Sequence, residues 1–255
     1  MSVTLRSCLA PTALFLAACV HAAPAAACTM TVPFQYEFEN QVRTSLSAAN
    51  ASDPCAFTVS VNTGAGPSAA GVVHYRRGRP LTLLRYGFRL DTSGLSGFAL
   101  ATRQLQLFSA LSPVVVNAGS PTSALLTLTL RGGFPDPNVA FFAARSGNNG
   151  PAIAVRSLPL GVHTIRLEIT TGAGSAGVVR YWIDHTYGDP PDGTIDNSGT
   201  GLDNAAWLGV IAAEIGLSNP SNAFRTNNAD NMLVFDQFES SDDVLFYDDF
   251  SSGAQ

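Results

Sequence analysis

Apolar and polar residues alternate with a period of two along most of this chain of 255 residues. This spacing is typical of β-strands with one buried face, because successive side chains of a strand point to opposite sides. The segment 33–40 is the clearest case, with three aromatic side chains on one face and three polar ones on the other: Phe34, Tyr36 and Phe38 against Gln35, Glu37 and Glu39. A sustained helical period of 3.6 residues is nearly absent. The pattern therefore predicts an all-β protein.

Turn-forming clusters rich in Gly, Asn and Pro, such as 62–67 and 146–150, separate the predicted strands. The segment 203–217 has enough alanine for a helix, but Gly209, Gly216 and its β-branched residues favour a strand. Many strands with short connections indicate a two-sheet antiparallel sandwich. The remaining predicted strands are 55–61, 71–76, 81–91, 98–107, 124–131, 139–144, 162–170, 178–184, 232–239 and 244–247.

The N-terminal segment has the features of a secretory signal peptide. Arg6 precedes an apolar run at 8–20 that is too short to span a bilayer, and small residues dominate 22–27. Two Ala-x-Ala sites, 23–25 and 25–27, fit the small-residue rule for cleavage. We therefore expect a signal peptide at 1–27, one β-sandwich domain at 28–250 and a C-terminal tail at 251–255.

A second interpretation of the same segment is a lipoprotein signal. Residues 16–19, Leu-Ala-Ala-Cys, resemble a bacterial lipobox, in which Cys19 would be lipidated and become the first mature residue. The first interpretation predicts a secreted or periplasmic protein, and the second predicts a lipoprotein anchored in the outer membrane.

Two cysteines, Cys28 and Cys55, remain after the signal segment. An even pair in an exported protein predicts a disulfide, which would stabilise the fold by about 3–4 kcal/mol through loop closure.

Composition narrows the function classes. Charged residues make up 13% of the chain, hydrophobic residues make up 46%, and the net charge is −5. A mildly acidic chain has no electrostatic footprint for nucleic acid, and no transmembrane segment is expected in the mature chain. All basic residues are arginine, which excludes Schiff-base and P-loop lysines.

The segment 162–184 has the most distinctive pattern. Its first strand turns Ile165, Leu167 and Ile169 to one side and Arg166 and Glu168 to the other, and after a Gly-rich loop the second strand alternates in the same way: Val179, Tyr181 and Ile183 against Arg180 and Trp182. This hairpin, with the later segments 207–210 and 235–240, resembles those of laminin G-like and concanavalin A-like jelly rolls, including bacterial exported members. The chain departs from them at His185, where Gly is usual, and in a long insert at 187–204. The resemblance implies a concanavalin A-like jelly roll, a fold shared by lectins, glycanases, adhesion modules and structural domains.

Motifs for catalysis are weak. The Glu-x-Asp-x-x-Glu pattern that glycanases of this superfamily place on one strand is absent. Glu37 and Glu39 have suitable spacing for a carboxylate pair, but two solvated charges on an outer face explain them better. No serine-nucleophile or zinc motif includes the mature histidines His74, His163 and His185. A polysaccharide lyase site would draw on Arg180, Tyr181 and His74, but no sequence motif supports such a site. No residue is therefore assigned as catalytic.

One loop could bind Ca²⁺, because hard oxygen ligands crowd it: Asp189, Asp192, Asp196, Asn197, Asp203 and Asn204. Their spacing matches no known calcium loop, and the same residue types fill ordinary exposed loops.

A glycan site needs an exposed aromatic ring beside planar hydrogen-bonding groups. If Tyr181 faces the core, Trp182 is displayed with Arg180 and Arg166, and these three are the predicted ligand-binding residues. In the alternative, Trp182 packs in the core and Tyr181 faces water. The sequence thus favours a non-catalytic binding module for glycan or another surface ligand. The alternatives are a structural protein of the cell envelope and a glycan-cleaving hydrolase or lyase.

Overall fold

The computed structural model describes residues 34–40, 42–47, 56–66, 70–96, 104–112, 123–132, 139–144, 152–172, 176–200, 202, 209–241 and 245–248. Cys19, Cys28 and Cys55 lie outside these residues, so the predicted disulfide and the predicted processing site stay predictions. No helix in the described part of the chain is long and apolar enough to cross a membrane.

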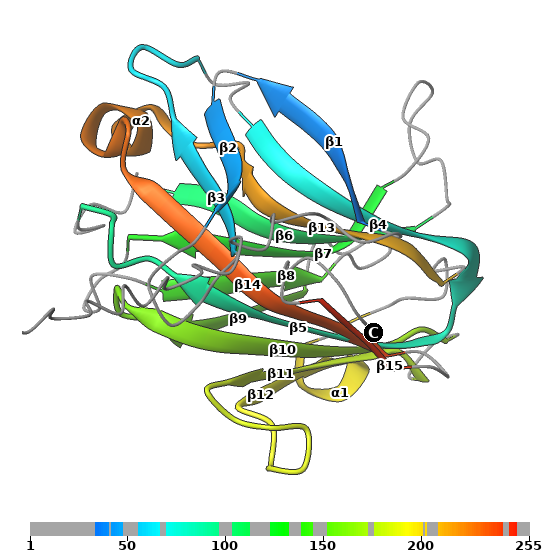
Figure 1. Cartoon of the computed structure of the whole chain (residues 1–255). Helices are drawn as coiled ribbons and strands as arrows, with labels where there is room; N and C mark the ends of the chain where they lie inside the picture. Colours follow the sequence, from blue (N-terminus) through cyan, green and yellow to red (C-terminus); the bar gives the residue numbers. More distant parts are fainter. Residues whose placement is uncertain are drawn as a thin grey trace, which may run out of the picture.

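Two antiparallel sheets make up the described structure and lie one against the other (Figure 1). One is seven-stranded, in the spatial order β1 (Phe34–Asn40), β4 (Ala70–Leu81), β13 (Val210–Ser218), β6 (Gln104–Ser112), β7 (Ser123–Arg131), β8 (Val139–Ala144) and β9 (Ala152–Ser157).

The other is eight-stranded, in the order β12 (Gly193–Asp196), β11 (Val178–Ile183), β10 (Val162–Thr170), β5 (Leu83–Asp91), β14 (Met232–Ser241), β3 (Ala56–Val61) and β2 (Val42–Ser47), with β15 (Leu245–Asp248) paired to β14. The predicted two-sheet antiparallel sandwich is confirmed.

The core lies between the sheets and is built from the apolar face of each strand. On β5, Tyr86 and Phe88 are fully buried and meet Phe108 of the opposite sheet, with ring centroids 5.7 and 5.8 Å apart. Near the β8 and β11 edges, Phe142 stacks on Tyr181 at 4.1 Å. Buried aromatic residues supply a large hydrophobic contribution, which holds the two sheets together.

Most predicted strands are confirmed within a residue or two. The strand predicted at 71–76 is longer, Ala70–Leu81, and three further predictions shift. The strand expected at 98–107 occupies Gln104–Ser112 in the described residues, and the doubtful segment 203–217 forms a strand at Val210–Ser218. The insert 187–204 was expected to be a plain loop. It contains β12, which pairs with β11, and the short helix α1 (Asn197–Thr200).

Besides β12 and α1, three elements were not expected: β2, β9 and the helix α2 (Asn222–Asn228). Helix α2 begins at Ser221, whose hydroxyl accepts a hydrogen bond from the Phe224 amide, and it buries Phe224 and Asn228. Gln104 attaches this end of the helix to β6. Its carbonyl accepts from the Ser221 amide at 2.9 Å, and its amide donates to the Ser221 hydroxyl at 3.1 Å. An amphipathic pattern over seven residues, about two turns, is too short to stand out from strand alternation.

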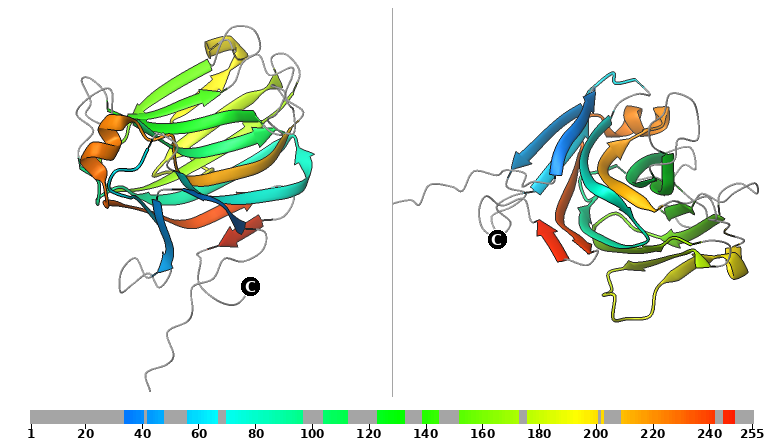
Figure 2. Two further views of the ribbon diagram at one scale, coloured as in Figure 1. Left: turned by 90° about the horizontal axis from the view of Figure 1, so that it is seen from above. Right: turned by 90° about the vertical axis from the view of Figure 1, so that its right-hand side faces the viewer.

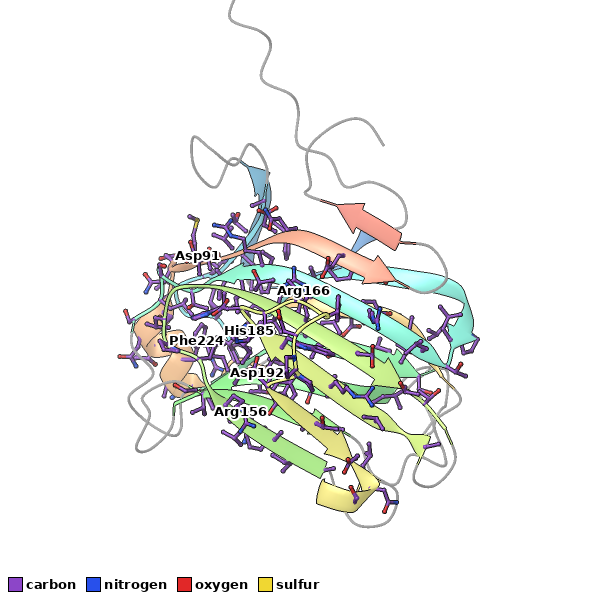
Figure 3. All side chains as sticks on the ribbon, turned by 90° about the horizontal axis from the view of Figure 1, so that it is seen from below. Asp91, Arg156, Arg166, His185, Asp192 and Phe224 are labelled. Carbon is purple, nitrogen blue, oxygen red and sulfur yellow. The ribbon has the colours of Figure 1, made fainter. Side chains whose placement is uncertain are left out.

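The two sheets also meet at one edge, where β9 lies near β12. The Arg156 side chain donates from Nε and Nη2 to the Asp192 carbonyl, at 3.0 and 2.6 Å. Figure 3 shows Arg156 and Asp192 near one another on this side of the molecule. This clamp links the last strand of the seven-stranded sheet to the β11–β12 hairpin.

Candidate functional site

The sequence-predicted ligand residues lie on the β10–β11 hairpin, on the face of the eight-stranded sheet that points away from the core. Tyr181 is fully buried between the sheets, so the first of the two sequence alternatives describes the strand orientation correctly. Trp182 pairs with Arg166 across the hairpin, and Arg180 pairs with Glu168. The structure therefore brings the three predicted residues together on one face.

These arginines are already bound by carboxylates. Glu168 accepts from Arg180 Nη1 at 2.6 Å and from Arg85 Nε at 2.8 Å, and it is 7% exposed. Arg166 donates from Nε to Glu239 at 2.8 Å and from Nη1 to the His185 carbonyl at 2.7 Å. A partly buried network of this kind is held together because each charge has a partner.

The turn 184–192 covers Trp182. Its indole is only 3% exposed and donates to the Asp189 carbonyl at 2.8 Å. The Tyr187 ring lies edge-on to it at 5.2 Å, with Arg85 and Arg166 near the Tyr187 ring. The expected display of Trp182 to solvent is therefore wrong in this structure, because neighbouring loop residues occupy the space in front of it. Figure 3 shows His185 of this turn close to Arg166 and Asp192.

The described aspartates of the loop considered for calcium have internal partners. Asp189 accepts from the Thr186 amide and hydroxyl at 2.8 and 2.9 Å, and these bonds lower the pKa of its carboxyl. Asp192 accepts from the Ile183 amide at 2.6 Å, and Asp196 accepts from the Ser198 hydroxyl. The described residues contain no cluster of three or more His, Cys, Asp or Glu that could hold a metal ion. Asp203 and Asn204 lie outside the described residues.

The three residues considered for a lyase site are not assembled. Tyr181 lies in the core, Arg180 is on the opposite face of β11, and His74 belongs to β4 of the other sheet. His163 lies at the start of β10, with Nδ1 2.8 Å from Asp184 and Nε2 2.9 Å from the Pro159 carbonyl. Glu37 and Glu39 lie on β1, where the pairing with β4 shifts by one residue between Tyr36 and Phe38. This bulge interrupts the regular alternation on which the hypothesis of a carboxylate pair depends.

A second face carries more usable chemistry: the outer face of the seven-stranded sheet. In the view from above, the strands of this sheet lie in front and α2 lies at one end of them (Figure 2, left). The strand register places side chains opposite one another in rows across neighbouring strands; all are at least partly exposed except Ser109, which is 2% exposed. One row is Ser218, Gln106, Thr129, Phe141 and Val155; the next is Glu214, Ser109, Thr127, Ala143 and Ile153; a third is Gln104, Arg131, Val139 and Ser157.

These rows have a polar half and an apolar half. Strands β13, β6 and β7 contribute mainly hydroxyls, amides and charged groups, whereas β8 and β9 contribute mainly apolar side chains. Ile153 and Val155 on β9 are 42% and 43% exposed. From ordinary strand spacings, the three rows extend about 13 Å along the strands and about 19 Å across five of them. We call this area the sheet face.

Arg131 and Phe141 mark the boundary between the two halves. The Arg131 guanidinium carbon lies 3.7 Å from the centre of the Phe141 ring, which is within range for a cation–π contact. On β6, the neighbour of β7, the Gln106 side chain donates to the Ser109 hydroxyl at 2.7 Å. This bond orients the Gln106 amide. A planar cation, an aromatic ring and an oriented amide thus lie within neighbouring rows.

Among the described side chains of the sheet face, Glu214 is the one that carries a carboxyl group. The register pairs it with Ser109 on β6 and with His74 on β4. Burial raises the pKa of Glu214, because desolvation disfavours the charged form. This favours the protonated carboxylic acid, which can both donate and accept a hydrogen bond.

Sequence reasoning did not single out the sheet face. The signal was present in the alternation of 124–131, which turns Thr127, Thr129 and Arg131 to one side. A single strand could not show that Gln106 and Phe141 lie opposite Thr129, because the order of the strands is a property of the whole sheet.

Comparison with known proteins identifies the fold. No family model and no curated protein matches the chain. Among solved structures, an endo-β-1,4-glucuronan lyase from the fungus Trichoderma reesei is similar at 16% identity and TM-score 0.58, covering 81% of this chain and 90% of its own. An endo-1,3-β-glucanase from Streptomyces sioyaensis is 11% identical with TM-score 0.43, covering 82% and 96%. The carbohydrate recognition domain of Emp47p is 12% identical with TM-score 0.43, covering 80% and 90%.

The fold is thus a two-sheet antiparallel jelly-roll sandwich, as the sequence predicted. The finer resemblance to laminin G-like domains stays a prediction.

Proposed function

We propose that this protein is an exported bacterial glycan-binding module and that it binds its ligand on the sheet face. The observation that carries the proposal is the arrangement of hydroxyl, amide, guanidinium and aromatic groups in neighbouring rows of one half-exposed surface. Sugars have hydroxyl edges and apolar C–H faces. A surface with a polar half beside an apolar half matches both parts of such a ligand.

The eight-stranded sheet is less suited to this role. Its Trp182 is covered, and Arg166 and Arg180 are bound to Glu239 and Glu168. A ligand would have to displace Tyr187 and separate paired charges, which costs free energy before any contact is gained. The solved structure with TM-score 0.58 is named for a polysaccharide substrate, which supports a glycan as the ligand class.

The proposed activity is binding of the glycan without cleavage. Hydrolysis of a glycosidic bond normally needs two carboxyl groups in fixed relation. The described side chains of the sheet face provide one, Glu214.

The test is a binding measurement on a glycan array, followed by calorimetry with any polymer that binds. We expect Gln106→Ala and Thr129→Val to weaken binding about fivefold to tenfold each, since a neutral hydrogen bond contributes about 1 kcal/mol. The matched control is Thr194→Val on β12, an exposed position of the other sheet, and it should bind normally. Trp182→Ala is not a suitable probe, because it removes a buried side chain and would test folding.

Two results would refute the proposal: no glycan bound by the intact folded chain, or binding unaffected by changes on the sheet face. Appearance of unsaturated or reducing products from a bound polymer would replace binding by cleavage. Export is proposed together with this function, and mass spectrometry of the mature N-terminus would distinguish cleavage after Ala25 or Ala27 from lipidation at Cys19.

A further inference from the structure

Arg131 differs from the other arginines in how its side chain is used. Every other arginine whose side chain the structure describes donates to a carboxylate or to a backbone carbonyl: Arg85, Arg89, Arg166 and Arg180 to carboxylates, and Arg156 and Arg225 to carbonyls. Arg131 makes no hydrogen bond or ion pair with any described residue, and its buried Nε has no hydrogen-bond partner. Its contact is the ring of Phe141.

A partly desolvated cation without an anion is costly, and a ligand that brings an anion to it would offset that cost. Burial lowers the pKa of the Arg131 guanidinium, and no carboxylate of the described residues acts on it in the opposite direction. Phe141 supports the flat side of the group and thereby limits its rotation. The terminal Nη1 and Nη2 amino groups are then the hydrogen-bond donors left to bind a ligand.

The neighbours of Arg131 define what such a ligand looks like. Gln104 lies opposite on β6, and Val139 lies opposite on β8. Gln106 and Thr129 stand one row further along the strands. A ligand that reaches Arg131 therefore also meets an amide, a hydroxyl and an apolar strip.

We infer that Arg131, stacked on Phe141, binds the carboxylate of an acidic sugar, so that the glycans bound on the sheet face are polymers of uronic acid. This inference rests on the proposed function, since it names the ligand class of the same face. A guanidinium presents two parallel N–H donors that fit the two oxygens of a carboxylate, and a partly desolvated setting strengthens the pair. The adjacent amide and hydroxyl bind the ring hydroxyls.

Matched polymers provide the test. Polygalacturonate, polyglucuronate and polymannuronate are each compared with their fully methyl-esterified forms, which keep the backbone and remove the charge. We expect at least one free acid to bind about tenfold to hundredfold more tightly than its ester, the range for a charged hydrogen-bonded contact. Raising the salt concentration should weaken binding of the free acid more than binding of the ester.

Variants then assign the preference to Arg131. In Arg131→Gln the free acid should lose tenfold to hundredfold in affinity, while the ester changes less than twofold. Arg131→Lys keeps the charge without the planar fork and should fall between the two, and Phe141→Leu should weaken binding of the free acid without abolishing it. Arg156→Gln is the matched control: it removes an arginine from the same sheet at a position opposite Ala140, in a core row and not on the sheet face. Thermal melts confirm that each variant is folded.

The outcomes separate the two claims. Equal affinity for acid and ester, or equal loss of both in Arg131→Gln, overturns the assignment while leaving glycan binding intact. Tighter Arg131-dependent binding of dextran sulfate than of any uronate replaces the carboxylate by a sulfate and also overturns it. If no polymer binds the folded chain, the proposed function and this inference fail together.

Discussion

Tyr187 provides the sharpest test of how the outer face of the eight-stranded sheet is stabilised. Its ring covers Trp182 and lies near Arg85 and Arg166, with the Arg85 guanidinium carbon 5.1 Å from the ring centre. Its hydroxyl is buried and has no hydrogen-bond partner among the residues that the structure describes. Burial raises the pKa of this phenol far above its ordinary value, so it is uncharged at any pH at which the protein folds.

The ring and the hydroxyl should therefore have opposite effects on stability. A buried hydroxyl without a partner costs about 1–3 kcal/mol, so Tyr187→Phe should raise the free energy of unfolding by about 1 kcal/mol. For a domain of this size, that is a rise in Tm of about 2–4 °C. Tyr187→Ala removes the ring and should lower the free energy of unfolding by about 3 kcal/mol.

Urea titration followed by tryptophan fluorescence measures both effects. The chain has two tryptophans, so a Trp207→Phe background leaves Trp182 as the single reporter. Tyr187→Ala should shift the native emission of Trp182 to longer wavelength and increase its quenching by acrylamide, whereas Tyr187→Phe should leave both unchanged. A loss of 1 kcal/mol or more in Tyr187→Phe would refute the reasoning, because it would mean that the hydroxyl contributes a favourable bond.

Three further predictions concern titration and close packing. Because burial raises the folded-state pKa of Glu214 above its usual 4.5, ionisation opposes folding, so Glu214→Gln should gain stability over wild type as the pH rises above about 4.5 in urea titrations. Asp189 has the opposite sign: its pKa lies below the usual 3.8, so its stabilisation is present at neutral pH and is lost in acid, and Asp189→Asn should show a flatter dependence of Tm on pH at the acid end. A Cβ on Gly193 would overlap the ring of Tyr181, so Gly193→Ala should lower the free energy of unfolding by about 1–3 kcal/mol. Gly188→Ala is the control, because a Cβ there would lie 3.7 Å from its nearest atom, and it should change the Tm little. Equal effects of the two substitutions on Tm would contradict the packing argument.

The comparison of sequence and structure is clearest on the hairpin 162–184. Alternation alone identified which side chains of β10 and β11 face the core, and Ile165, Leu167 and Tyr181 are all fully buried. It did not show that Trp182, on the other face, is buried as well. The turn 184–192 covers it through contacts that join residues by no regular spacing, such as the bond from its indole to the Asp189 carbonyl.

The sheet face illustrates the same limit. Thr129 and Arg131 alternate visibly along one segment, but their partners Gln106, Gln104 and Phe141 come from strands elsewhere in the chain. Strand order and register result from packing the whole sandwich, so no local pattern contains them.

By itself, the sequence determined the fold class, because a period of two with frequent turns leaves few ways to bury apolar residues other than two facing sheets. It also determined two exclusions: the acidic net charge argues against nucleic acid as a ligand, and the absence of lysine excludes Schiff-base and P-loop chemistry. Only the tertiary structure decided which surface is available. It covered Trp182 and paired Arg166 and Arg180 with carboxylates, and it left Arg131 stacked on Phe141 beside the amides of a neighbouring strand. The physical reason is that burial and charge pairing depend on contacts between distant segments, whereas strand alternation depends only on near neighbours.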